Sequence, residues 1–139
     1  MGITSGGNVG IGTTNPSAKL DVRGSFVYGN TAGSILLDQN TVTTTSVTQT
    51  VIETTGTSGW SSSKVVVSIK DNVTSETQLS ELLLTHNGST AVATEYGVVY
   101  TSGILASFDV DISGGNMRLL ATSASTNSTT YNVAATQLK

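Results

Sequence analysis

The sequence predicts an all-β protein, an antiparallel β-sandwich of the jelly-roll type with an extended, glycine-rich arm at its N-terminus. Three observations support this fold class. Short runs of aliphatic and aromatic residues recur along most of the 139-residue chain, separated by Gly, Asn and Ser. No stretch sustains the three- and four-residue apolar spacing of an amphipathic helix. The chain also has no room for the crossovers that a parallel sheet requires.

The first segment, residues 1–24, is rich in glycine and contains the only proline. Val9 and Ile11 alternate with glycines, which favours a short extended piece with little side-chain bulk on one face. So short a segment buries too little apolar surface to fold alone. We therefore expect two parts, a stalk or joint arm over 1–24 and a β-sandwich domain over 25–139.

The remaining runs have the length, composition and spacing of strands in sandwiches and barrels. They cover residues 24–29, 34–39, 46–55, 64–71, 78–86, 91–101, 105–113, 116–124 and 129–138. One run leaves an alternative open, because the leucines of residues 75–86 also fit one face of a short helical turn.

Turn chemistry predicts two hairpins. The tetrapeptides HNGS at 86–89 and SGGN at 113–116 supply the Asn and Gly residues that accept positive φ values. The strands they join lie around 79–86 and 91–100, and around 104–112 and 117–123.

The clearest period-two alternation lies in residues 105–113. One face of this run holds Ala106, Phe108, Val110 and Ile112, and we predict that it is the core face. Leu105, Ser107, Asp109 and Asp111 fall on the other face.

Composition excludes several classes of protein. The net charge is -3 and the six Lys and Arg residues are dispersed, so no basic stripe exists to bind nucleic acid. No apolar run approaches the ~20 residues of a membrane span, so we expect no membrane partner. Without cysteine, the chain has no disulfide, thiolate nucleophile or Cys-ligated zinc. Charged residues make up only 11% of the chain, so its surface is rich in hydroxyl groups instead.

The remaining candidates for chemistry are few. Gly7, Gly10 and Gly12 match neither the dinucleotide nor the phosphate-loop pattern, so we expect no cofactor. The single histidine, His86, lies beside a predicted turn and is expected to be exposed to solvent, although in a trimer it would instead line the threefold axis. Serines are too abundant for a Ser-His-Asp pairing to be informative.

Two carboxylates, Asp109 and Asp111, share a strand face and could ligate calcium together with Glu95 or Asp71. They match no calcium-loop pattern, and neighbours on one strand do not flank a sugar as glycoside hydrolysis requires. We favour a solvated face opposite Arg118. The sequence therefore predicts no metal site, no catalytic residue and no enzymatic activity.

Two aromatic residues are candidates for binding a glycan. Trp60 is flanked by small residues, where an indole would either stack on a sugar ring or cap the core. Tyr96, like Tyr28, Tyr100 and Tyr131, is a candidate for partial exposure at a glycan site or an interface, although packing in a strand explains each of them as well.

The segment GNVGIGTTNPSAKLDVRG, residues 7–24, resembles a segment of tail-fibre and other virion structural proteins of tailed bacteriophages. The C-terminal words ISGGNMRLLATSASTNSTTYNVAATQL resemble the closing hairpin of a sandwich module in structural proteins of marine, cyanophage-like viruses. The resemblance implies a homotrimer in which the first segment winds three chains together, with Lys19, Asp21 and Arg23 pairing between chains. The joint residues that it implies are Val9, Ile11, Pro16, Leu20 and Val22.

The resulting hypothesis is a trimeric tail-fibre or fibre-tip module that recognises a host surface polysaccharide or continues the appendage. Its partners would be further copies of itself and other virion proteins, and it would be made in the bacterial cytoplasm and reside in the virion. Three alternatives stay open: a monomeric carbohydrate-binding or adhesin module, a capsid decoration protein, and a hydrolase.

Overall fold

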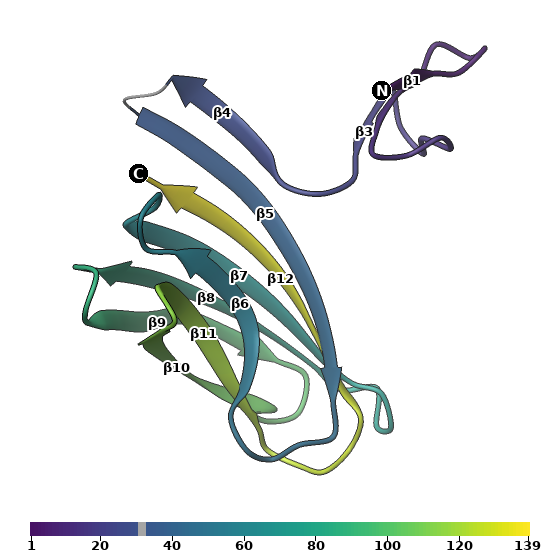
Figure 1. The fold of residues 1–139 in the computed structure, drawn as a ribbon. Helices are drawn as coiled ribbons and strands as arrows, with labels where there is room; N and C mark the ends of the chain where they lie inside the picture. Colours follow the sequence, from purple (N-terminus) through teal and green to yellow (C-terminus); the bar gives the residue numbers. More distant parts are fainter. Residues whose placement is uncertain (31–32) are drawn as a thin grey trace.

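The structure is a computed structural model that describes residues 1–30 and 33–139, and within these ranges every regular element is a β-strand. Figure 1 shows a small N-terminal sheet set apart from two larger sheets that lie against each other. The small sheet has the order β1 (Gly2–Ile3), β2 (Val9–Ile11), β3 (Leu20–Val22). The largest sheet has the order β4 (Phe26–Asn30), β5 (Gly33–Thr44), β12 (Thr129–Leu138), β7 (Ser62–Asp71), β8 (Thr77–His86), β9 (Ala91–Tyr100). The facing sheet has the order β10 (Ala106–Ser113), β11 (Asn116–Ser123), β6 (Thr50–Gly56).

All neighbours in the two larger sheets are antiparallel. The predicted all-β class and antiparallel sandwich are therefore confirmed, while the jelly-roll connectivity stays a prediction. The division of the chain after residue 24 also stays a prediction.

Both predicted hairpins form. Gly88 has φ +94° in the turn between β8 and β9, and the Asn87 side chain accepts hydrogen bonds from the backbone N–H groups of Ser89 and Thr90 at 3.0 and 2.8 Å. Gly114 and Gly115 have φ +58° and +76° between β10 and β11. These positions need glycine because other residues rarely adopt positive φ.

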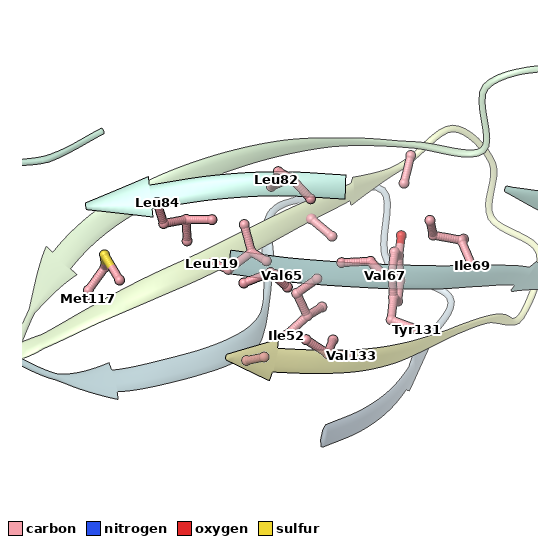
Figure 2. Packing of buried hydrophobic residues seen from close by; sticks show 13 residues of the cluster. Ile52, Val65, Val67, Ile69, Leu82, Leu84, Met117, Leu119, Tyr131 and Val133 are labelled. Carbon is pink, nitrogen blue, oxygen red and sulfur yellow. The ribbon is translucent and has the colours of Figure 1, made fainter. Parts of the chain in front are cut away.

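The core lies between the two larger sheets (Figure 2). Alternate residues of β7, namely Val65, Val67 and Ile69, face inward and are fully buried. Leu82 from β8 and Leu119 from β11 meet them. Burying one such side chain stabilises the fold by about 1.5–3 kcal/mol. Phe108, Val110, Ile112 and Ala106 of β10 also pack into this core, as the alternation predicts.

The helical alternative for residues 75–86 is wrong, because β8 is a strand paired on both sides. Its inward positions include the buried Gln78, whose side-chain oxygen accepts hydrogen bonds from the backbone N–H groups of Leu105 and Ala106 at 2.6 and 3.2 Å. A buried polar side chain thus ties β8 to the beginning of β10.

Candidate glycan-binding and assembly sites

Trp60 lies in the connection between β6 and β7 and is partly exposed. Its carbonyl oxygen accepts a hydrogen bond from Nε2 of His86 at 2.5 Å. The backbone N–H of Gly88 donates to Nδ1 of the same ring at 2.9 Å, so the proton sits on Nε2. His86 therefore joins the Trp60 connection to the β8–β9 hairpin. The expectation of a freely exposed turn histidine is wrong, because the ring is partly buried and both its nitrogens are engaged.

Tyr96 lies on β9 and is 51% exposed. The register slips by one residue beside it: Glu81 pairs with Gly97 and Leu82 with Glu95, so Tyr96 is the extra residue of a β-bulge. The hydrogen bond to Glu81 is the main cause that raises the pKa of the Tyr96 phenol.

The Tyr96 ring belongs to a charged group on the outer face of the largest sheet. Nζ of Lys64 lies 2.6 Å from Oε1 of Glu81. This contact is the main cause that raises the pKa of Lys64 and lowers the pKa of Glu81. Beside the group lies an open hollow of about 280 Å³, lined by Val66, Leu79, Glu81, Gly97, Val98 and Val99. An exposed aromatic ring, an ion pair and a shallow apolar hollow thus lie together on this face.

The structure does not bring Trp60 and Tyr96 into one site. Trp60 contacts β8 at His86, whereas Tyr96 lies opposite Glu81. Five residues of β8 separate these points, which is roughly 17 Å along a strand. The glycan-binding roles of Trp60 and Tyr96 both stay predictions.

The candidate calcium carboxylates are dispersed into separate structural roles. Asp111 forms an ion pair with Arg118 across the β10–β11 hairpin, as the favoured interpretation predicts, and this pair lowers the pKa of Asp111. Asp109 accepts a hydrogen bond from Gln49 at 3.1 Å. Asp71 accepts bonds from the backbone N–H groups of a turn and from Asn127, which lowers its pKa. Among the described residues no three His, Asp or Glu side chains form a cluster that could hold a metal ion.

Two buried polar side chains of the sandwich, Glu53 and Gln137, are not indicated by the sequence pattern. Glu53 is only 6% exposed and its Oε2 atom has no hydrogen-bond partner, and the same holds for both side-chain polar atoms of Gln137, which is 1% exposed. Burial raises the pKa of Glu53 to about 7, and the charge of Asp38 adds to this effect. Strand alternation would place Ile52 and Glu53 on opposite faces. A bulge leaves Ile52 without a partner on β11, and both residues are buried.

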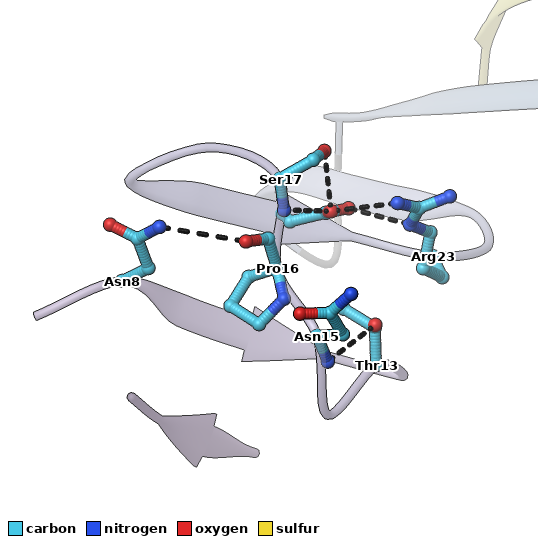
Figure 3. A network of polar contacts seen from close by, with 7 residues as sticks. Asn8, Thr13, Asn15, Pro16, Ser17 and Arg23 are labelled. Atoms are coloured by element: carbon cyan, nitrogen blue, oxygen red, sulfur yellow. Dashed lines mark hydrogen bonds and ion pairs between the residues drawn. The ribbon is translucent and has the colours of Figure 1, made fainter. Parts of the chain in front are cut away.

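The N-terminal sheet gathers the predicted joint residues, with one exception. Val9 pairs with Leu20, and Ile11 with Val22, in parallel register. Paired residues project from the same face of a sheet, so these four side chains form one apolar face, with Leu20 and Ile11 exposed. Pro16 lies apart and is buried, and its carbonyl oxygen accepts a hydrogen bond from Asn8 at 3.5 Å (Figure 3).

The charges of this segment pair within the chain. Asp21 lies 2.7 and 2.9 Å from Nε and Nη2 of Arg23, and it accepts hydrogen bonds from the backbone N–H and hydroxyl of Ser17 at 2.9 and 3.0 Å. The hydrogen bond from Arg23 is the main cause that lowers the pKa of Asp21 to about 2, and the bonds from Ser17 add to it. Lys19 donates to the carbonyl of Gly6 at 3.0 Å. Within one chain these groups therefore hold the local turn together, and pairing between chains stays a prediction.

The sheets and this arrangement define an antiparallel β-sandwich module preceded by a small sheet with one exposed apolar face. No protein-family model and no curated protein sequence matches the chain. The described residues include no helix that could cross a membrane.

Two solved structures are similar in fold. A tailspike protein of Acinetobacter baumannii bacteriophage Fri1 matches with a TM-score of 0.51 at 15% identity, over 81% of this chain and 19% of that one. A tailspike protein of Acinetobacter baumannii phage AM24 matches with a TM-score of 0.47 at 7% identity, over 75% of this chain and 26% of that one. Since the second score is below 0.5, the Fri1 comparison alone bears on the fold. The chain spans about a fifth of the Fri1 protein.

The Fri1 comparison supports the predicted resemblance to tailed-phage appendage proteins at the level of fold, and the marine, cyanophage-like detail stays a prediction. It also carries a correction. The Fri1 tailspike is described as a capsular polysaccharide depolymerase, which is an enzyme. This finding contradicts the prediction that the protein is not an enzyme, and we withdraw that prediction.

Proposed function

We propose that the chain is a module of a phage tail appendage, assembled as a homotrimer, that recognises a bacterial surface polysaccharide. The observation that carries the proposal is the fold shared with the Fri1 tailspike over 81% of the chain. That protein is described as acting on capsular polysaccharide, so its substrate class is the first ligand to test here. The module would reside in the virion tail and contact other tail proteins.

The outer face around Tyr96 is the proposed glycan-binding site. Its exposed ring adjoins the Lys64–Glu81 pair and the hollow over Val66 and Leu79. Sugars present an apolar C–H face to an aromatic ring and hydroxyl groups to charged partners. One hollow of this size suits weak binding, and three copies on one body would gain avidity through effective concentration.

The exposed apolar face of the small sheet supports a trimer joint. Ile11 and Leu20 lie side by side on the face that Val9 and Val22 share, with no element of the described chain covering them. Association would remove this surface from water, which is the main driving force for joining chains. Pro16 contributes indirectly, by shaping the turn before Ser17.

The glycan proposal is tested by measuring binding of the full chain to purified capsular polysaccharides from a panel of bacterial strains. We expect the Tyr96→Ala variant to bind at least about tenfold more weakly. Tyr100→Ala is the matched control, because Tyr100 is 52% exposed on the same strand but pairs with the inward-facing Gln78. Equal loss in both variants, or no binding to any polysaccharide, would overturn the proposed site. Released oligosaccharide is measured in the same samples, so that cleavage and binding are scored together.

The trimer is tested by the solution mass of the full chain from light scattering. We expect three chains in the wild type and fewer in a variant with Ile11→Asp and Leu20→Asp. A monomeric wild type that still binds polysaccharide would favour the isolated carbohydrate-binding module instead. A trimer that binds no polysaccharide would favour a capsid decoration protein.

A further inference from the structure

One end of the outer face of the largest sheet is apolar and exposed. We define this surface, the apolar end, by Phe26, Tyr28, Leu37, Leu83, Val92 and Leu138. Their exposed fractions lie between 44% and 68%, with Tyr28 the most exposed. None of these residues belongs to the joint or to the hollow beside Tyr96.

Strand register places all six side chains on the same face. One row of directly paired residues runs across the sheet through Tyr28, Ile35, Leu138, Ser62, Thr85 and Val92. The next row runs through Phe26, Leu37, Thr136, Lys64, Leu83 and Thr94. Directly paired residues project from the same face. The inward neighbours on these strands, such as Val65 and Leu84, fill the core, so this face points away from it.

The exposed apolar area matches that of an interface between proteins. At the exposures given above, two aromatic and four aliphatic side chains present roughly 400 Å² of apolar surface. A standard interface buries about 800 Å² on each partner, of which about 56–65% is apolar, or roughly 450–500 Å². The apolar end thus supplies most of the apolar surface that one stable contact requires.

The charges of this surface suit contact with an identical chain. Lys64 is the one charged residue in the two rows, and its ammonium is neutralised by Glu81 at 2.6 Å. A copy that docks over the two rows therefore buries no unpaired charge belonging to them.

The surface also contains a knob and a hole. Tyr28 is 68% exposed on β4, beside the edge of the sheet. An open hollow of about 280 Å³ lies over β12, β7 and β8, between Leu138 and Leu83. Tyr28 does not line the hollow of its own chain. We propose that Tyr28 of one copy enters the hollow between Leu83 and Leu138 of a second copy of this chain.

This contact is heterologous, because the knob and the hole are different patches. Repeated from copy to copy, such a contact closes into a ring or extends into a filament. Phe26 follows the joint strand β3 by four residues, so the two surfaces are close together in the sequence. The inference rests on the proposed homo-oligomer and assigns it a second contact outside residues 1–24.

The test is disulfide trapping in the full chain, which contains no native cysteine. Two single variants, Tyr28→Cys and Leu138→Cys, are oxidised separately and as an equal mixture. We expect a covalent dimer in the mixture and little in either sample alone. The control mixes Tyr28→Cys with Val73→Cys, because Val73 is 68% exposed, more than Leu138 at 45%, but lies in the β7–β8 turn at the other end of the strands.

A second measurement does not depend on cysteine chemistry. We expect Tyr28→Ala to weaken self-association about thirtyfold by light scattering over a dilution series. An oligomeric wild type with no trapped Tyr28–Leu138 pair, or with unchanged association in Tyr28→Ala, overturns the inference and leaves the proposed function standing. A wild type that is monomeric at every concentration overturns both the inference and the proposed trimer. An oligomeric wild type that binds no polysaccharide contradicts only the proposed function.

Discussion

The buried Glu53 makes a quantitative prediction about stability and pH. Its carboxyl group has an ordinary pKa of 4.5, which burial raises to about 7 in the folded protein. At about 1.4 kcal/mol for each pH unit, this difference amounts to about 3 kcal/mol. Below pH 4.5 the group is protonated whether the chain is folded or unfolded, so it contributes no penalty. As the pH rises toward 7 the unfolded chain releases the proton first, and the free energy of unfolding falls by about this amount.

The perturbation is Glu53→Gln, which keeps the shape of the side chain and removes its ionisation. Urea unfolding, followed by the fluorescence of the single Trp60, gives the free energy of unfolding of both proteins from pH 4.5 to 8 at one protein concentration. Carboxylates with lowered pKa values, such as Asp21 and Asp111, lose their contribution as the pH falls, but they act equally in both proteins and cancel in the difference.

We expect the variant to gain on the wild type as the pH rises, by about 3 kcal/mol between pH 4.5 and 8. Leu79→Ala, which removes no ionisable group from the exposed face of β8, is the control and should show a constant difference from the wild type. A difference between Glu53→Gln and the wild type that is the same at pH 4.5 and pH 8 would refute the reasoning.

Three further substitutions test other features. Tyr131→Phe removes a buried hydroxyl 2.7 Å from that of Ser123, and urea unfolding should show a loss of about 1–2 kcal/mol; an unchanged midpoint would mean that the hydrogen bond contributes nothing. Leu82→Ala empties a fully buried position and should cost about 2–5 kcal/mol by the same assay, whereas Leu79→Ala on the exposed face should cost far less. Gly12→Ala places a Cβ atom 2.7 Å from the carbonyl oxygen of Arg23 at φ +76°, so hydrogen exchange should quicken in β2 and β3 but not in the sandwich. Protection unchanged in β2 would contradict that account.

The elements of the fold could be predicted because their signals are local. The Asn87–Gly88 and Gly114–Gly115 pairs specify turns that depend on a few neighbouring residues, and the alternation around Phe108 fixes which face of β10 is buried. The surroundings of Glu53 and Tyr96 were harder to predict, because they depend on β-bulges, which leave no sequence pattern. One bulge buries Glu53, and another makes Tyr96 the extra residue of β9.

The expectation about His86 was wrong because a tertiary contact decides where its ring lies. The sequence places His86 beside a turn, but its ring is held by the carbonyl of Trp60, which lies 26 residues earlier. Asp21 and Arg23 are close enough to pair within one chain, and their pairing between chains stays a prediction.

The position of β12 constrains how the sandwich folds. The strand lies between β5 and β7, and Leu138 pairs with Ile35 about a hundred residues earlier. Without β12 the strand order leaves two separate parts, β4–β5 and β7–β8–β9, each with one edge that only β12 pairs. Closing so long a loop costs conformational entropy before the hydrogen bonds of β12 can form. Folding should therefore be slow, and docking of β12 should limit its rate. Until β12 docks, the unpaired edges of β5 and β7 are the parts of the chain most able to pair wrongly with other chains during synthesis.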